Sequence, residues 1–179
     1  MASILGVVFI ILFALSFQAA RQRSLFTIQS GALVAIIGHF YLLGAWGACI
    51  TNALSLCRTL SAAYLSSGGR NAIFLVLVPI SLIAIEWTAA SAVHAGILAA
   101  IAMSCLYASW TQNILGTRLC YLVASALWLV FGTITGAWVL LISEILNGAS
   151  ILLALWYYHI PTNLMAPPYN KKSYLAFFE

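Results

Sequence analysis

Residues 125–156 read SALWLVFGTITGAWVLLISEILNGASILLALW, and this stretch decides the fold of the chain. Two apolar runs flank the turn TGAW at residues 135–138, and the turn contains no lysine or arginine. Taken to their full predicted bounds, residues 117–136 and 138–158, the two runs have the roughly 20 residues that an α-helix needs to cross the hydrocarbon core of a bilayer. Neither run alternates apolar and polar residues, as the strands of a membrane barrel do. The stretch therefore predicts a helical hairpin inside a membrane.

The composition extends this interpretation to the whole chain. Of its 179 residues, 64% are hydrophobic and 6% are charged, and the mean hydropathy is +1.08. Soluble domains carry roughly 25% charged residues, so the composition indicates an all-α integral membrane protein surrounded by membrane lipids. The net charge of +4 comes from scattered basic residues that form no continuous basic face, which argues against a nucleic-acid partner.

Short gaps divide the chain into seven predicted transmembrane helices. Lysine and arginine fall in alternate gaps: Arg21, Arg70 and Arg118 mark three of them, whereas the turns near Gly44 and Gly136 contain neither. The positive-inside rule then places the N-terminus outside the cell and the C-terminus in the cytoplasm. The predicted helices cover residues 3–20, 25–44, 46–66, 71–87, 90–110, 117–136 and 138–158, and a cytoplasmic tail covers 161–179.

Two pairs of identical residues recur at one spacing. Asn52 and Asn147 lie 95 residues apart (147 − 52), and so do Arg23 and Arg118 (118 − 23). We therefore predict that residues 1–160 form one domain of two parallel three-helix repeats, at 3–66 and 90–158, joined by a linker helix at 71–87. Some secondary transporters built from parallel repeats bind their substrate between the two halves, near the bilayer midplane.

Polar side chains at membrane depth are the candidates for a binding site. An ionisable side chain there costs about 2.5–3.5 kcal/mol on insertion scales, so it usually faces a cavity or a partner. The third and seventh predicted helices each carry one, Arg58 and Glu144, with asparagine and serine nearby. The second and sixth helices add a histidine and a tryptophan. The predicted lining of a central cavity is Asn52, Asn147, Ser55, Arg58, Glu144, Ser143, His39 and Trp128.

Other interpretations of these residues remain open. Arg58 and Glu144 can pair with each other, and the asparagine and serine side chains can join helices by hydrogen bonds without binding a solute. The chain would then be a membrane scaffold or a lipid-binding subunit. Catalysis is disfavoured because no second carboxylate lies at the predicted depth of Glu144. The four cysteines form no CxxC pair, and we expect neither a metal nor another cofactor.

Two stretches carry a resemblance to a known family. Residues 39–60, HFYLLGAWGACITNALSLCRTL, and residues 125–156 resemble the YgjV group of bacterial inner-membrane proteins, and the resemblance covers residues 20–158. It implies a multi-pass helical fold in the bacterial inner membrane.

The three-one-three plan is also similar to the SWEET and PQ-loop transporters. In that superfamily the asparagines that correspond to Asn52 and Asn147 contact a sugar or another small solute. The first and fifth predicted helices lack the Pro-Gln pair of the superfamily, and the one intramembrane proline is Pro79, in the linker helix. This resemblance implies a transporter of a small polar solute, either sugar-like or a small anionic metabolite. The chain is also compatible with a homo-oligomer.

Overall fold

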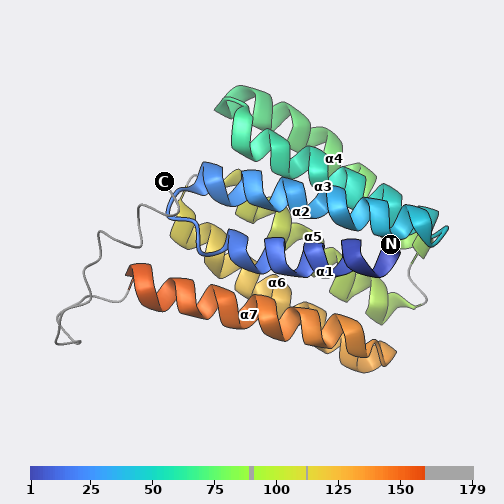
Figure 1. Cartoon of the computed structure of the whole chain (residues 1–179). Coiled ribbons are helices and arrows are strands. Elements are labelled where there is room, and N and C mark those ends of the chain that lie inside the picture. The colour runs from blue at the N-terminus through green and yellow to red at the C-terminus, as the bar shows by residue number, and fades with distance from the viewer. Residues whose placement is uncertain (89–90, 112, 160–179) are drawn as a thin grey trace.

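The computed structural model describes residues 1–88, 91–111 and 113–159, apart from the side chains at positions 47 and 86–88. Across these ranges the chain forms seven α-helices and no strand (Figure 1). The helices are α1 Ala2–Ser16, α2 Gln22–Leu42, α3 Trp46–Tyr64, α4 Ser67–Thr88, α5 Ala92–Trp110, α6 Ile114–Thr135 and α7 Trp138–His159. The predicted all-helical class is confirmed. The predicted cytoplasmic tail, residues 161–179, lies outside the described residues.

The first helix differs most from its predicted bounds. α1 is 15 residues long and ends at Ser16, whereas the apolar run predicted a helix up to residue 20. The backbone tightens after that point, because the amides of residues 17, 18 and 19 each donate to the carbonyl three residues earlier, at 3.4, 3.0 and 3.1 Å. The chain then enters α2 at Gln22. Residues 17–21 therefore form a compact connection rather than the last turn of a longer helix.

Five helices have the length and apolar composition of membrane spans. They are α2, α5, α6, α7 and the part Ser67–Ile85 of α4. α1 is apolar but shorter than a full span. In the described part of the chain α3 falls outside this set although it has 19 residues, because Asn52, Arg58 and Thr59 interrupt its apolar sequence.

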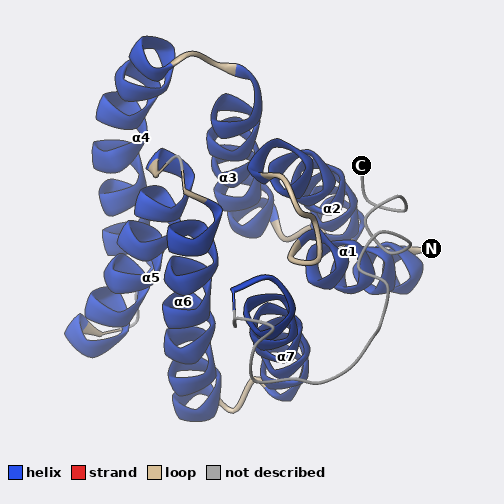
Figure 2. Ribbon diagram, turned by 90° about the vertical axis from the view of Figure 1, so that its left-hand side faces the viewer, coloured by secondary structure: helices blue, strands red, loops and turns tan. Residues whose placement is uncertain are grey.

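The helices pack as two three-helix groups bridged by α4. In the first group α2 contacts both α1 and α3, and in the second group α6 contacts both α5 and α7. α4 contacts α3 on one side and α5 on the other (Figure 2). Between the groups α1 contacts α7, and α3 contacts α5. Among these six helices, exchanging α1 with α5, α2 with α6 and α3 with α7 leaves the set of contacts unchanged, whereas the two contacts of α4 do not follow this exchange.

The connections α2–α3 and α6–α7 share one backbone conformation. Gly44 and Gly136 both adopt the left-handed conformation, with φ angles of 69° and 68°, and a side chain is strained there. The amide after each glycine donates to the carbonyl five residues before it, at 3.0 and 2.9 Å. The next helix begins directly afterwards, at Trp46 and at Trp138.

These matching turns set a different register from the asparagine pair. Gly44 and Gly136 lie 92 residues apart (136 − 44), whereas Asn52 and Asn147 lie 95 apart. Asn147 is therefore three residues, about 4.5 Å, farther along its helix than Asn52 is along its own. Aligned on the turns, Asn52 corresponds to Glu144 (52 + 92).

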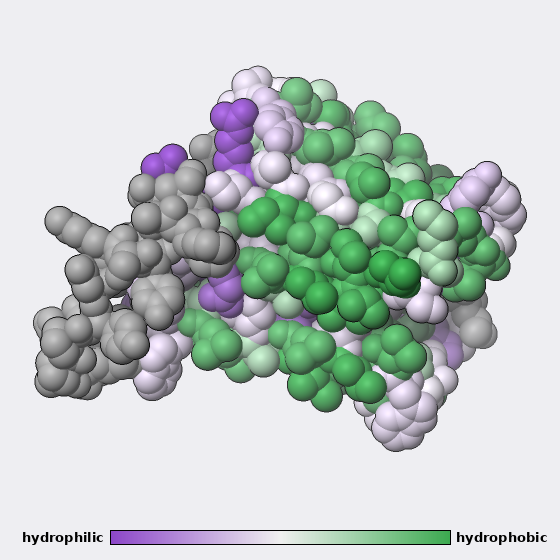
Figure 3. Space-filling model, viewed as in Figure 1, coloured by the Kyte–Doolittle hydropathy of each residue, from purple (hydrophilic) through white to green (hydrophobic). Residues whose placement is uncertain are grey.

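The tightest packing lies at the end of the bundle that holds the α1–α2 and α5–α6 connections, which we call the inner end. The buried hydrophobic cluster there comprises Phe17, Ala19, Leu25, Phe26, Ala108, Tyr121 and Ile151. The middle of the molecular surface is hydrophobic over α1 and α7, with polar residues toward both ends (Figure 3). Exposed apolar side chains such as Ile4, Leu75 and Val139 fit a lipid environment.

Candidate functional site

Polar side chains from five helices meet between the two helix groups. We call this set the central polar cluster. Its members come from α2, α3, α5, α6 and α7, and hydrogen bonds or electrostatic interactions link each member to at least one other. They are Gln29, Arg58, Cys105, Ser109, Tyr121, Ser125, Glu144 and Asn147.

Glu144 occupies the α6–α7 side of the central polar cluster. The Ser125 hydroxyl lies 2.7 Å from Glu144 Oε2 and 3.0 Å from the Glu144 carbonyl oxygen, and both oxygens accept from it. Asn147 Nδ2 donates to Glu144 Oε1 at 3.5 Å, one turn along the same helix. The second carboxylate oxygen is therefore held only by this long hydrogen bond.

Tyr121 and Gln29 connect α6 of one group to α2 of the other. The Tyr121 hydroxyl donates to Gln29 Oε1 at 3.1 Å. Tyr121 is 5% exposed and Gln29 is fully buried. A polar bridge of this kind in the interior requires that every remaining donor also find a partner, because a buried polar group without one costs free energy.

Arg58 extends from α3 toward α5 across the boundary between the groups. Its guanidinium lies within electrostatic range of the Cys105 thiol of α5 and of the Tyr121 hydroxyl of α6. Glu144 acts electrostatically on the same Cys105 thiol. A positive and a negative group thus lie near one cysteine. Within the described part of the chain no ion pair joins Arg58 to Glu144, whose carboxylate is bound by Ser125 and Asn147 instead.

Three buried polar atoms of the cluster have no hydrogen-bond partner among the residues that the structure describes: Gln29 Nε2, Arg58 Nε and Asn147 Oδ1. Two of them are donors from the first helix group and the third is an acceptor from the second. In folded proteins about nine in ten buried polar groups are paired, so each exception needs a physical explanation. These three atoms are the positions in the cluster at which a water, an ion or a polar ligand would find a partner.

Two other predicted site residues hydrogen-bond to main-chain oxygens. Asn52 Nδ2 donates to the Ala48 carbonyl at 2.8 Å, within α3. His39 Nδ1 lies 2.8 Å from the Ala2 carbonyl oxygen of α1, on the side of α2 away from α3. The structure therefore directs these two side chains to different neighbours.

The remaining predicted residues lie on the same helices as the cluster. The Ser143 hydroxyl donates to the Leu140 carbonyl at 2.8 Å, and Ser143 is buried. Ser55 is half-buried on α3. The Trp128 ring packs edge-on against Phe131, with 5.5 Å between the ring centroids. Of the eight predicted residues, the structure links Arg58, Glu144 and Asn147 through the cluster.

Sequence reasoning missed the other cluster members. Gln29 lies on α2, Tyr121 and Ser125 lie on α6, and all three side chains are buried. Gln29 carried the clearest signal, because an amide at membrane depth is costly unless it faces the protein interior. The direction in which Tyr121 and Ser125 point depends on how α6 packs, which its sequence does not specify.

Comparison with known proteins decides the family. The family Imp-YgjV, bacterial inner membrane protein, matches residues 1–160. The chain belongs to this family. Its location is accordingly the bacterial inner membrane, in agreement with its apolar helices. No curated protein and no solved structure matches the chain.

At the inner end of this Imp-YgjV protein a buried arginine closes the end of α1. Arg118 of α6 is 1% exposed. Its Nη2 donates to the carbonyls of Phe17 and Ala19 at 3.0 and 2.8 Å, and its Nε lies 3.3 Å from the Phe17 carbonyl. Nη1 lies 3.0 Å from His159 Nε2, and the guanidinium stacks 4.7 Å from the centre of the Tyr158 ring. A cation at a helix C-terminus also compensates the helix dipole.

The opposite pair of helices makes a corresponding contact. Gln22, at the start of α2, donates to the carbonyl of Thr111, the residue that ends α5, at 2.5 Å. The same amide donates to Thr117 Oγ1 at 3.0 Å. Thus α2 holds the end of α5, while α6 holds the end of α1 through Arg118 and Phe17. These contacts fix the two helix groups to each other at the inner end.

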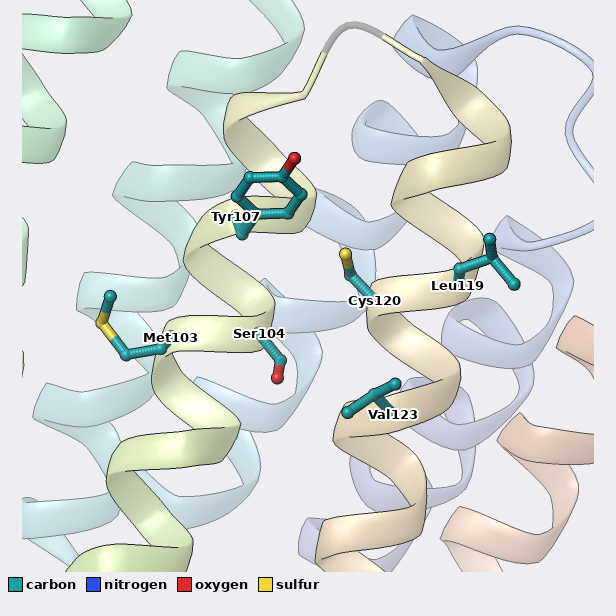
Figure 4. Close-up of a pocket in the computed structure, with 6 residues that line it drawn as sticks. All are labelled: Met103, Ser104, Tyr107, Leu119, Cys120 and Val123. Atoms are coloured by element: carbon teal, nitrogen blue, oxygen red, sulfur yellow. The ribbon is translucent and has the colours of Figure 1, made fainter.

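Two surface grooves lie away from the central polar cluster. One, between α5 and α6, has a volume of about 430 Å³ and an almost entirely apolar wall (Figure 4). The other, between α4 and α5, has a volume of about 720 Å³. The first groove is lined by Met103, Ser104, Tyr107, Leu119, Cys120 and Val123. None of the predicted site residues lines either groove.

Proposed function

We propose that this Imp-YgjV protein transports a small polar solute, sugar-like or a small anionic metabolite, and binds it in the central polar cluster. The observation that carries the proposal is the set of three unpartnered atoms, Gln29 Nε2, Arg58 Nε and Asn147 Oδ1. They lie beside charges of opposite sign that do not pair with each other. A solute supplies the missing partners.

The energetic cost of this arrangement favours a functional role. A charged side chain at the centre of a bilayer costs about 2.5–3.5 kcal/mol on insertion scales. A purely structural use of Arg58 and Glu144 recovers most of that cost through a direct ion pair with further hydrogen bonds. Glu144 is bound instead by Ser125 and Asn147, and Arg58 Nε has no partner.

The proposal includes two parallel repeats, α1–α3 and α5–α7. Three observations support it: the exchange symmetry of the helix contacts, the matching turns at Gly44 and Gly136, and one repeated cation–π pair. The guanidinium of Arg23 lies 5.1 Å from the centre of the Tyr64 ring, and Arg118 repeats this contact with Tyr158 at 4.7 Å. The spacings are 95 and 94 residues (118 − 23 and 158 − 64). The central polar cluster lies between the proposed repeats.

The proposed topology has seven spans, with the inner end of the bundle in the cytoplasm. It rests on the segregation of basic residues, since Arg21, Arg23, Arg70 and Arg118 all lie near the inner end. The turns at Gly44 and Gly136 then face outward. A likeness to SWEET and PQ-loop transporters stays a prediction, as does solute contact by Asn52, Ser55, Ser143, His39 and Trp128.

A membrane scaffold or lipid-binding subunit is the second candidate. The groove between α5 and α6 favours it, because its wall is apolar and it lies between two helices of membrane-spanning length (Figure 4). An acyl chain fits such a wall better than a sugar or an anion does.

A solute screen by thermal shift separates the two candidates. Purified protein in detergent is heated with sugars, organic acids, amino acids and phosphate esters, alongside the variants Asn147→Ala and Asn71→Ala. Asn71 is the matched control, because its side chain accepts from Trp110 Nε1 at 2.9 Å in an exposed position. We expect at least one solute to raise the Tm of wild type and Asn71→Ala but not that of Asn147→Ala. A screen in which no solute raises the wild-type Tm favours the scaffold.

A further inference from the structure

We infer that the solute of the central polar cluster is a small zwitterion, a molecule with one carboxylate and one ammonium group, such as a neutral α-amino acid. The inference rests on the proposed binding of a small polar solute and puts a zwitterion in place of the sugar-like and anionic solutes. It follows from the chemistry of the unpartnered atoms and from the charges around them.

The first helix group offers donors to an anion. Gln29 Nε2 of α2 and Arg58 Nε of α3 are buried donors without an acceptor. Gln29 is fully buried, and its Oε1 is already occupied by the Tyr121 hydroxyl. Arg58 adds a positive charge and a planar donor set suited to a carboxylate. These two side chains therefore select an anionic acceptor.

The second helix group offers acceptors to a cation. Asn147 is 3% exposed, and its Oδ1 has no donor. Its Nδ2 is oriented toward Glu144 Oε1, so the free oxygen is the part of the amide left for a ligand. Ser125 holds the other carboxylate oxygen of Glu144, which leaves a negative charge beside Asn147. Acceptor oxygens next to a carboxylate select an ammonium group.

The charge balance favours a ligand that carries both of these groups. The cluster holds one guanidinium, Arg58, and one carboxylate, Glu144, which both act on Cys105 and form no ion pair with each other. A lone anion leaves Glu144 uncompensated, and a lone cation leaves Arg58 uncompensated. A sugar compensates neither charge. A zwitterion compensates both, and in a low-dielectric interior an uncompensated charge is costly.

Matched small molecules test the inference by equilibrium binding to the purified full-length protein. L-alanine is compared with L-lactate, which replaces the ammonium group by a hydroxyl, with isopropylamine, which lacks the carboxylate, and with glucose. We expect L-alanine to bind at least about tenfold more tightly than each of the others. Arg58→Gln and Glu144→Gln should each weaken alanine binding by about tenfold or more. Arg70→Gln is the matched control, since Arg70 is a buried arginine with an unpartnered Nε in α4 and the same loss of charge leaves the cluster intact.

The cysteines provide a second readout that locates the ligand. Cys105 belongs to the central polar cluster, whereas Cys120 lines the groove between α5 and α6. In variants that retain only one of them, L-alanine should slow modification of Cys105 by N-ethylmaleimide and leave the rate at Cys120 unchanged. Equal protection of both thiols, or protection of Cys120 alone, overturns the assignment of the ligand to the cluster.

The outcomes separate this inference from the proposed function. Binding of lactate or glucose as tight as that of alanine overturns the zwitterion and leaves a solute site in place. Binding of isopropylamine alone does the same. If none of the four molecules binds or protects Cys105, the zwitterion inference is wrong, and the thermal-shift screen over the wider set of solutes decides whether the proposed site stands.

Discussion

Replacing Arg118 by methionine should be the most destabilising single change at the inner end of the bundle. The guanidinium is 1% exposed and satisfies the Phe17 and Ala19 carbonyls, which have no helical partner beyond the end of α1. A buried acceptor left unpaired costs about 1–3 kcal/mol. The stack on Tyr158 contributes about 1 kcal/mol more. We expect Arg118→Met to lower the free energy of unfolding by at least about 3 kcal/mol.

Arg23→Met is the matched control for this prediction. Arg23 occupies the corresponding place in α2 and stacks on Tyr64 at 5.1 Å, but it is exposed. An exposed cation–π contact is worth about 0.5–1 kcal/mol. Thermal unfolding in detergent measures both variants, and each kcal/mol should shift Tm by about 2–4 °C for a chain of this size. Equal Tm shifts for Arg118→Met and Arg23→Met contradict the prediction, because the contacts of Arg118 with the carbonyls then contribute nothing to stability.

Three further predictions concern topology, the α6–α7 contact and the second turn. In a variant without native cysteines, Ala45→Cys should react with a membrane-impermeant thiol reagent on intact cells and Arg70→Cys should not; labelling of both contradicts the proposed orientation. Ser125→Ala and Glu144→Gln should destabilise the protein by less together than the sum of their separate effects, since their side chains are 2.7 Å apart; additive losses in a denaturation assay contradict direct coupling. Gly136→Ala should cost about 1–2 kcal/mol because φ is +68° there, and an unchanged Tm shows that the turn relaxes.

The helices were predictable because short gaps that contain a glycine, a basic residue or another polar residue separate the long apolar runs, as at Gly44, Glu86 and Gly136. Predicted and observed bounds agree to within one residue at both ends of α7, predicted at 138–158 and observed at Trp138–His159. The prediction for α1 was wrong by four residues (20 − 16), because the apolar side chain of Phe17 extends the hydrophobic run although the α-helix ends at Ser16. The amide of Phe17 donates to the third residue back, and its side chain is buried in the inner-end cluster, so burial continues past the end of the helix.

The site was predictable in part. Arg58, Glu144 and Asn147 were predictable because they are charged or amide side chains inside apolar runs. The free-energy cost of placing such a side chain in lipid is large however the helices pack. The rotation of each helix decides which of its weaker polar residues face the interior, and this depends on tertiary contacts. The Tyr121 hydroxyl donates to Gln29 Oε1 at 3.1 Å although the two residues lie 92 positions apart in the sequence. Neither α2 nor α6 alone indicates this contact.

The register of the proposed repeats could not be predicted from the sequence either. Equal spacing of two residue pairs suggested a single offset of 95, whereas the turns at Gly44 and Gly136 are related by 92. A three-residue difference is close to one helical turn, so it leaves a side chain on nearly the same face at another depth. Asn52 and Asn147 can share a direction without sharing a partner, as their different hydrogen bonds indicate.

Solute counterflow into proteoliposomes is the most direct test of transport through the central polar cluster. Vesicles that contain the purified protein and a high internal concentration of unlabelled L-alanine are diluted into a trace of labelled L-alanine. We expect vesicles with wild type or Arg70→Gln to accumulate label transiently, and we expect no accumulation in vesicles with Arg58→Gln or in empty vesicles. Accumulation that survives Arg58→Gln, or its absence from wild type for L-alanine and for every solute that the thermal-shift screen selects, contradicts transport through the central polar cluster.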